Sequence, residues 1–541
     1  MPIDGKIVKE FIKRRDTMVA ARSVWESHWQ EITNYFIPRK ATITRRGVPG
    51  EKRMSEIYDS TAFRALDILG AGLNNRLTSA LDRWFTYKTE NDALMEIHEV
   101  KEWLQEVERR VYNVFAGSNF GNEIHESYLD DASIGTSIFY IEKDPKDIVR
   151  FQTRHISECC IAEDNKGRVD TVFRSFQMTA RQATQTWGEN AGEKIVKAMK
   201  TESDKEKLFD FIHVVLPRHE YDSRKSDKLN MPWASFYINV GEKRLVEEGG
   251  YHEMPYIVCR WLKGTGEVYG RSACMVALPD AKMLNEMSYT TLKGAQKVVD
   301  PPLMLPDDGV VGTVRTGAGG IVYIRANAWA GGMKPETIKM GGDVRLGLEM
   351  EDQRRKSINQ SLFVDLFLML TERPEMTATE VLKRIQERIS ILVGTAPRIM
   401  SEKLTPIHDR VFSILLRGGH LPLLPTVLRG ENIVVEYVSQ MARVQKMYEV
   451  DAIRNAFADA GPYLDIFPQM ADNVNPDGLW TVIADAHAFP QIAQHDKRTV
   501  RKIREAKQQE AQKEAQKEDI ERLVGSAATL KKAGIDVPAI T

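Results

Sequence analysis

Two long helical patterns of similar length enclose a glycine-rich segment, and this arrangement constrains the fold more than any other feature of the chain. The first predicted helix covers 277–299 (ALPDAKMLNEMSYTTLKGAQKVV) and ends before Asp300-Pro301-Pro302. Proline cannot continue a helix, and it disfavours helical backbone in the residue before it. The second predicted helix covers 343–367. At about 1.5 Å per residue, each helix would be roughly 30–35 Å long.

The segment between these helices has a different amino-acid composition. Residues 301–342 contain nine of the 36 glycines of the chain and only short apolar runs such as IVYI. No helical period of apolar residues is present, so a compact, loop-rich β module is expected. The sequence therefore predicts a small module at the tip of two long helices.

A proline-containing break follows the second helix, in the stretch TERPEMTATEVLKRIQER (371–388). Residues 371–376, with Pro374, are predicted to form a short polar loop. Thr377 and Glu380 have the spacing of a capping box, in which the threonine hydroxyl accepts an early amide and the glutamate bonds the amide of the cap. Apolar residues then recur on one face from 381 to 393, which predicts a new helix.

The remaining chain predicts an α+β protein that is mostly helical. Apolar residues in the first 120 positions follow helical spacing, whereas 138–270 contains strand-like runs, a hairpin across DNKG (164–167) and a helical interval at about 179–206. After Gly418-Gly419 the chain is expected to be proline-rich and irregular. From about 496 a polar helix with an EAQK repeat is either solvated or bundles with copies of itself.

Composition excludes several classes of protein. The 541 residues contain no apolar stretch of about eighteen residues, so no membrane-spanning helix is expected. Four cysteines do not make a disulfide framework in so long a chain. Lys and Arg number 75 against 76 Asp and Glu, a net charge of −1. A protein that grips nucleic acid usually has a basic excess, so only a local patch or a channel that DNA slides through remains compatible.

Two local motifs suggest chemistry and are better explained by structure. KGTGEVYGRS (263–272) lacks the first glycine and the lysine of a phosphate-binding loop, so it is interpreted as a strand-to-helix turn. Cys159 and Cys160 lie near His155 and Glu158, but their spacing matches no structural zinc site. Neighbouring residues of a strand also point to opposite faces, which favours ordinary packing. No cofactor and no catalytic residue are therefore expected.

Four stretches in a fixed order resemble the portal (head-to-tail connector) proteins of short-tailed, podovirus-type bacteriophages. The resemblance covers roughly residues 10 to 480. The stretches are GAGLNNRLTSALDRWFTYK (70–88), similar to an early helix ending in Trp-Phe; AEDNKGRVDTVFRSFQMTARQATQTWGE (162–189), similar to a hairpin followed by a helix; EVYGRSACMVALPDAKMLNEM (267–287), similar to the entry of the first long helix; and RPEMTATEVLKRIQER (373–388), similar to the segment after the second long helix.

The resemblance implies a fold with wing, stem, clip and crown, assembled as a ring of about twelve copies. The implied parts are a wing (1–270), a first stem helix (271–300), a clip (301–342), a second stem helix (343–367), a tunnel loop (368–377), a wing helix returning to the crown (378–495), and a C-terminal crown helix with its tail (496–541).

The same resemblance implies function, partners and sites. The protein would be a non-enzymatic component of the virion at one capsid vertex, assembled in the host cytoplasm, with double-stranded DNA passing through its channel. The implied partners are the terminase large subunit, tail adaptor or nozzle proteins, and the major capsid and scaffold proteins, with no membrane. The candidate channel residues are Glu372, Arg373, Pro374, Glu375, Arg354, Arg355 and Lys356, and the candidate clip contacts are Asp307, Asp308, Arg315 and Arg325.

Two alternatives remain open at this stage. A tail adaptor or capsid-vertex scaffold would share the vertex without a DNA channel, although the tip module between two long helices speaks against it. A nuclease would need clustered carboxylates for a divalent metal. Asp307 and Asp308 are adjacent, but no third acidic ligand lies near them in the sequence.

Overall fold

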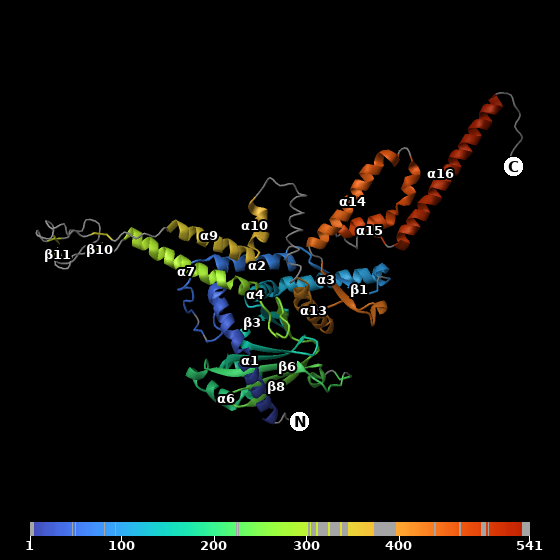
Figure 1. The fold of residues 1–541 in the computed structure, drawn as a ribbon. Coiled ribbons are helices and arrows are strands. Elements are labelled where there is room, and N and C mark those ends of the chain that lie inside the picture. Colours follow the sequence, from blue (N-terminus) through green and yellow to red (C-terminus); the bar gives the residue numbers. More distant parts are fainter. Residues whose placement is uncertain are drawn as a thin grey trace. The chain divides into compact units, whose positions relative to one another are not determined.

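The computed structural model describes residues 5–300, 344–372 and 396–532, apart from positions 46, 49, 81, 92, 223, 226, 438–439, 465–466, 488, 490–493 and 496. Between 301 and 343 it describes four two-residue strands. The chain divides into two compact units (Figure 1). The larger unit comprises residues 1–84 and 111–421, and the smaller unit comprises 85–110 and 422–541.

A five-stranded antiparallel sheet is the centre of one part of the larger unit. Its strand order is β4-β5-β6-β7-β8. The strands are β4 (Cys159–Glu163), β5 (Val169–Thr179), β6 (Leu208–Pro217), β7 (Trp233–Asn239) and β8 (Arg244–Tyr251). The hairpin predicted across DNKG is confirmed, because β4 and β5 pair around that turn and Gly167 has a φ of 77°. Glycine adopts this left-handed conformation without steric cost.

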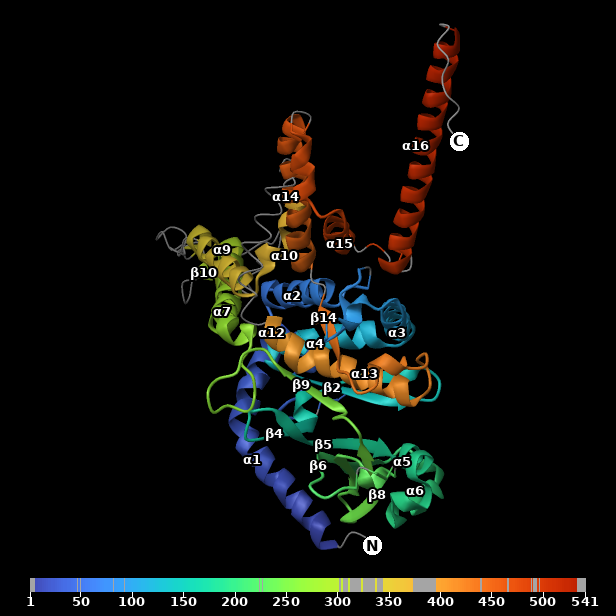
Figure 2. The same cartoon turned by 90° about the vertical axis from the view of Figure 1, so that its right-hand side faces the viewer.

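Helices cover both faces of this sheet (Figure 2). Successive strand residues point to opposite faces, so Ile212 of β6 packs in a cluster with Val8 of α1 (Gly5–Phe36), whereas Phe211 packs with helix residues on the other side. That other layer contains α5 (Ala180–Trp187) and α6 (Glu193–Met199). The helical interval predicted at 179–206 is thereby confirmed.

The second part of the larger unit surrounds a three-stranded antiparallel sheet of order β3-β2-β9. Its strands are β2 (Thr136–Asp144), β3 (Ile148–Arg154) and β9 (Tyr256–Arg260). All five residues of β9 and the first six of β2 are buried. The helices of this part include α2 (Thr61–Leu77), α4 (Phe120–Ser133) and a helical run of α12 (Ala396–Ile399), a π-helical turn (Met400–Leu404) and α13 (Thr405–Arg417).

The first long helix is present as α7 (Ala273–Val299), which begins four residues before the predicted start. Ser272 accounts for the difference, since its hydroxyl accepts the amide of Met275 at 3.1 Å and caps the helix. Pro279 consequently lies inside the helix. Residues of the predicted β module pair as β10 (Leu303–Met304) with β13 (Glu336–Thr337), and as β11 (Val310–Val311) with β12 (Tyr323–Ile324), both antiparallel.

The prediction of one unbroken second helix over 343–367 is wrong. Helix α9 (Val344–Ser361) ends early, and a separate helix α10 (Val364–Glu372) follows it. Phe363 interrupts the run with a φ of 57°, a left-handed conformation that is rare for a bulky side chain. The expected loop at 368–377 therefore begins later, since 368–372 are helical. The predicted capping box at Thr377 and Glu380 lies outside the described residues.

Two further predictions need correction in the smaller unit. The irregular region expected after Gly419 ends at about residue 432, because α14 (Gln440–Leu464) and α15 (Pro476–Ala486) lie in the later part of it. The RWFTYK stretch is not the end of a helix: α2 stops at Leu77, and β1 (Phe85–Thr89) pairs with β14 (Ile433–Tyr437). The two strands lie more than 300 positions apart in the sequence, which is why no local pattern predicted them. Helices α3 (His98–Gly117) and α16 (Lys497–Lys532) are confirmed in outline.

Candidate functional site

The candidate residues fall into two groups. Arg354, Arg355 and Lys356 lie on α9, and Glu372 is the last residue of α10. The other candidates lie outside the described residues, namely Arg373, Pro374, Glu375, Asp307, Asp308, Arg315 and Arg325. The site that can be built from geometry is therefore the pair of helices α7 and α9 with the chain that contacts them.

An ion pair and a hydrogen bond join α7 to α9 through Asp280. Arg354 Nη1 lies 2.9 Å from Asp280 Oδ1, and the Ser357 hydroxyl donates to Asp280 Oδ2 at 2.6 Å. Hydrogen bonding from Ser357 and then from Arg354 lowers the pKa of Asp280, so the carboxylate stays ionised at neutral pH. Farther along the pair, an added Cβ at Gly347 would lie 3.0 Å from the Thr291 hydroxyl, so the two helices approach closely there.

Arg355 points to a different partner. Its guanidinium lies 2.9 Å from Asp59 Oδ2 and also contacts Glu351 and Asp352 of its own helix. Burial alone would raise the pKa of Asp59, but hydrogen bonds from Thr61 and from Arg355 outweigh it and lower the pKa. Two of the three cations that the sequence analysis assigned to DNA are thus held by carboxylates, and Lys356 is exposed.

The chain just before α2 is fastened to α7 by a second set of contacts. The side chain of Asn285 accepts the amide of Tyr58 at 2.8 Å and donates to the carbonyl of Glu56 at 3.0 Å. The rings of Tyr58 and Tyr289 lie 4.6 Å apart, and the Lys293 ammonium sits 4.1 Å above the Tyr289 ring. Sequence analysis missed Asp59, Asp280 and Asn285, because their partners are distant along the chain and nothing local marks them.

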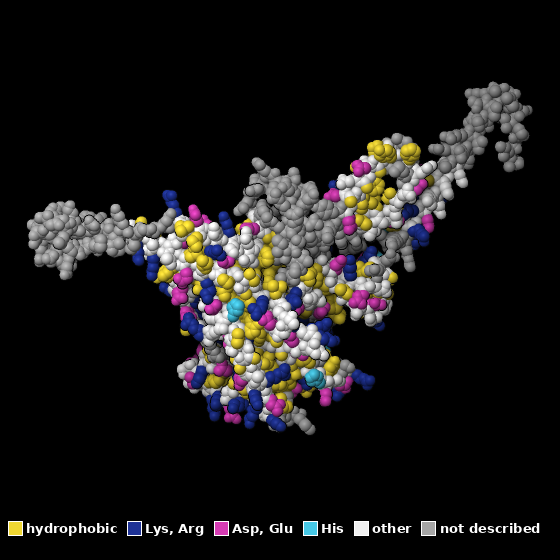
Figure 3. Space-filling view, viewed as in Figure 1, with side chains coloured by type: hydrophobic (Ala, Val, Ile, Leu, Met, Phe, Trp, Pro, Cys, Tyr) yellow, Lys and Arg dark blue, Asp and Glu magenta, His cyan; other side chains and the backbone are white. Residues whose placement is uncertain are grey.

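Several large apolar side chains on α7 and α9 are exposed. Val276 is 69% exposed and Leu346 is 59% exposed, and others on the same helices are at least 40% exposed. These others are Met283, Leu292, Val298, Val299, Leu348 and Met350. Figure 3 shows hydrophobic side chains among the charged ones over these helices. Single exposed apolar residues are normal, whereas contiguous apolar patches are typical of surfaces that other protein chains cover.

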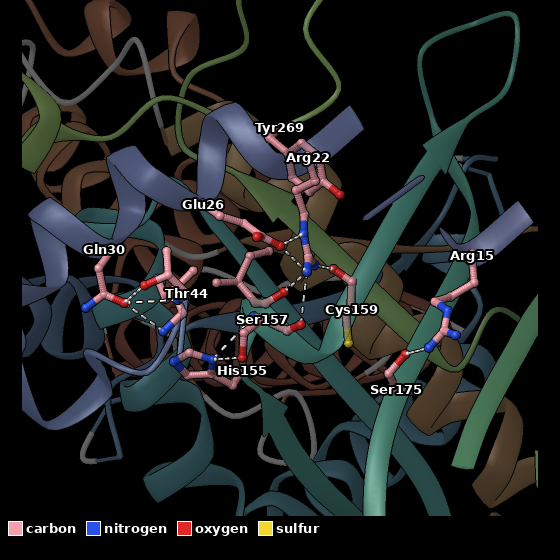
Figure 4. A network of polar contacts seen from close by, with 12 residues as sticks. Arg15, Arg22, Glu26, Gln30, Thr44, His155, Ser157, Cys159, Ser175 and Tyr269 are labelled. Atoms are coloured by element: carbon pink, nitrogen blue, oxygen red, sulfur yellow. Dashed lines mark hydrogen bonds and ion pairs between the residues drawn. The ribbon is translucent and has the colours of Figure 1, made fainter. Parts of the chain in front are cut away.

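A buried arginine links the N-terminal helix α1 to the chain between β3 and β4. Arg22 of α1 donates to the carbonyls of Ile156 (2.8 Å), Ser157 (3.0 Å) and Cys159, and it pairs with Glu26 (Figure 4). A guanidinium presents five donors, so one side chain satisfies a whole turn of backbone between β3 and β4. Cys159 and Cys160 follow this turn as the first two residues of β4, and burial raises the pKa of both thiols.

The motifs that suggested chemistry are structural in the part of the chain that is described. The KGTGEVYGRS stretch connects β9 to α7, as predicted, and Leu262 pairs with Arg271 across it. A Cβ at Gly270 would lie 2.1 Å from the Gly135 carbonyl, so this glycine allows two backbones to meet. Among the described residues, no group of three His, Cys, Asp or Glu side chains is placed to hold a metal ion. None of the described helices is both long and apolar enough to cross a membrane.

Comparison with known proteins gives one family over nearly the whole chain. The family described as "Bacteriophage head to tail connecting protein" matches residues 8–493. A probable portal protein of Bordetella phage BPP-1 is 31% identical over 540 residues, which are 97% of this chain and 96% of the relative. The portal protein of Salmonella phage epsilon15 is 28% identical over 511 residues, or 93% and 92% of the two chains.

One solved structure is also similar, at a lower level. It is described as the virion of a native gene transfer agent particle, and it superposes with a TM-score of 0.36 and 9% identity. The superposition covers 80% of this chain and 95% of that chain. A score this low carries no argument about this fold.

Proposed function

The chain belongs to the family of bacteriophage head to tail connecting proteins and functions as a phage portal, and from this premise we propose that its copies form a closed ring of about twelve around a channel for double-stranded DNA. The observation that carries the proposal is the relationship to two portal proteins over more than nine-tenths of the chain. The exposed apolar side chains of α7 and α9 support it, since neighbouring copies in a ring would cover them.

The parts of the chain take their proposed roles in this ring. Residues 1–270 form the wing, α7 and the second long helix form the stem, and 301–342 form the clip. Residues 378–495 lead to the crown, and the helix from 496 belongs to it. The loop that includes Glu372, Arg373, Pro374 and Glu375 narrows the channel.

The proposed partners follow from the position at the vertex. The clip, with Asp307, Asp308, Arg315 and Arg325, docks the terminase large subunit during packaging and tail adaptor or nozzle proteins afterwards. The wing contacts the major capsid and scaffold proteins. The ring assembles in the host cytoplasm and stays in the virion, and its role is structural.

A channel that passes DNA in both directions must not hold phosphates tightly, because each cationic contact would act as a brake. The near-neutral chain supports this requirement. So do Arg354 and Arg355, because a guanidinium already paired with a carboxylate offers less charge to a phosphate. Lys356 remains the exposed cation of this trio.

The mass of the purified protein in solution tests the proposal. One chain is 61.5 kDa, so a ring of twelve has a mass of about 740 kDa, and light scattering followed by negative-stain imaging should show a particle with a central hole. A monomer or dimer at every salt concentration, together with normal packaging in a phage that lacks the protein, would overturn the ring and favour a tail adaptor without a channel.

A further inference from the structure

The break between α9 and α10 has no cause in the local sequence. Helix breaks usually occur at proline, at glycine or at a π-bulge, yet residues 344–372 contain no proline and a single glycine, Gly347, far from the break. Phe363 nevertheless has a φ of 57°. Its amide donates to the carbonyl of Gln360 at 3.2 Å, three residues back, in place of the α-helical partner four residues back. Such strain in an L-residue persists only where the surroundings impose it.

A contact with another helix supplies that cause. Phe367 of α10 lies directly against Gly72 of α2, where an added Cβ would be 2.4 Å from the ring. Gly72 sits inside a regular helix and has no unusual backbone conformation. Its role is therefore steric: without a side chain at this position, the Phe367 ring can lie directly against α2. On both sides of the break, Leu362 and Val364 are buried as well. Figure 1 shows α10 turned away from the axis of α9 beside α2.

The same residues could form one straight helix. Residues 362–368 are Leu, Phe, Val, Asp, Leu, Phe and Leu. None of them is a glycine or a proline, and each is tolerated inside a helix, Asp365 at the highest intrinsic cost. Straightening would relieve the left-handed conformation of Phe363 and would give its amide the Asn359 carbonyl as acceptor. It would also withdraw Phe367 from Gly72. Tertiary contacts thus stabilise the bent conformation, and the local backbone preference opposes it. Such a balance is expected of an element that switches between two conformations.

We propose that α9 and α10 form a hinge at Leu362–Phe363, held in its bent position by Phe367 against Gly72. In the straight position α10 continues α9 and carries Glu372, the last residue of α10, away from α2. The hinge itself follows from this chain's own contacts. Its consequence for DNA, that the hinge sets how far the first residue of the candidate loop stands from the stem, rests on the proposed function.

Two substitutions are expected to move the hinge in opposite directions. Gly72→Ala places a methyl group where the Phe367 ring lies and favours the straight form. Phe363→Gly relieves the left-handed strain and weakens a continuous helix, so both of its effects favour the bent form. Gly294→Ala is the matched control, since nothing lies within 4 Å of a Cβ added to that helical glycine.

The measurement is a distance between spin labels at Gln353 and Leu368, both exposed, in full-length assembled protein with labelled copies diluted among unlabelled ones. Fifteen residues of straight helix separate the two backbone positions by about 23 Å, and the bent form gives a shorter distance. We expect the long distance to become the main population in Gly72→Ala, and to be absent in Phe363→Gly. Gly294→Ala should match the wild type.

Different results would contradict the hinge and the proposed portal function. An unchanged distance in Gly72→Ala rings overturns the hinge and leaves the portal function standing. A long distance in Phe363→Gly also overturns it. Absence of rings in the wild type itself would instead contradict the proposed function, and the label distance measured on the unassembled chain would still decide the hinge.

Discussion

At the scale of single residues, Lys403 shows how the larger unit is held together. Its side chain and that of Asp131 on α4 are fully buried and form an ion pair. The ammonium also donates to the Ser127 hydroxyl at 2.7 Å and lies 4.7 Å from the centre of the Tyr128 ring. Lys403 and its neighbour Glu402 belong to the π-helical turn 400–404, and Glu402 pairs with Arg260 of β9. This turn therefore ties the helical run to both α4 and the small sheet.

Removal of one partner of this ion pair should be costly. In Lys403→Met the charge of Asp131 would be buried without its cation, and we expect a loss of about 3–5 kcal/mol in the free energy of unfolding of the larger unit. The measurement is the midpoint of unfolding in denaturant. The double variant Lys403→Met/Asp131→Leu removes both charges and should recover much of the loss. If the single and double variants were equally destabilised, packing rather than charge would explain the effect.

The sequence could not predict this pair. Within SEKLTPIHDR, Lys403 has the appearance of a solvated lysine, and Asp131 lies 272 positions away. A π-helical turn shifts the direction of the side chains that follow it, and helical periodicity does not reveal that shift. The sequence did single out Arg354 and Arg355 as candidate channel residues. Their carboxylate partners, however, come near them only in the folded chain.

At the scale of elements, prediction succeeded where the determining contacts are local. The DNKG hairpin, the helical interval after it and the end of α7 before Pro301 all depend on residues a few positions apart. Prediction failed for elements whose ends or pairing depend on contacts between residues distant in the sequence. The end of α9 depends on Phe367 meeting Gly72, and β1 depends on β14. Apolar periodicity carried straight through Phe363, because periodicity contains no information about a glycine on another helix.

The loop proposed to narrow the channel can be tested by deletion. Deletion of residues 372–375, which include Pro374, should leave the mass of the ring unchanged, because the stem and wing contacts described above lie elsewhere. Packaging or retention of DNA should fall, since the proposed loop would no longer narrow the channel. The measurements are light scattering of the purified ring and the DNA content of purified particles.

A matched change elsewhere controls for shortening of the chain. Deletion of the exposed residues 219–222, a loop between β6 and β7, removes the same number of residues far from α10 in the sequence. It should leave DNA content at the wild-type level. Normal packaging and retention in the 372–375 deletion would exclude the assignment of this loop to the channel.

At the scale of the whole molecule, the α+β class and the family were both predictable. Helical period and strand alternation predict the class, and the four stretches that resemble portal proteins predict the family. These features are spread over most of the chain. The candidate site was predictable only in part, since α9 and the end of α10 were placed near the expected positions. Which cations are available to DNA depends on ion pairs formed across elements, and these are a property of the folded chain.

Two buried histidines make the stability of the larger unit depend on pH. His408 packs against Trp84 and Phe115, at 5.1 and 5.5 Å between ring centres, and burial lowers its pKa from 6.5 to about 3. Burial, with smaller contributions from Arg174 and Arg154, also lowers the pKa of His213, which bonds Tyr256 at 2.7 Å. A lowered folded-state pKa means that the unfolded chain binds the proton first. The stabilisation is therefore complete above the unfolded pKa and is lost as pH falls below it.

From pH 7 to pH 5 the thermal midpoint of the larger unit should fall, because each of these histidines can cost up to about 1.4 kcal/mol per pH unit below its unfolded pKa. In His408→Leu the buried group no longer titrates, so the fall over this range should be smaller than in the wild type, whatever the midpoint at pH 7. Part of the fall should remain, because burial also lowers the pKa of His213 and of His155. His219→Gln is the control, since His219 is exposed and solvated before and after unfolding. Calorimetry at half-unit steps measures the slopes. A slope in His408→Leu equal to that of the wild type would show that His408 takes up its proton within the folded chain, and that the contacts with Trp84 and Phe115 do not exclude the charged form.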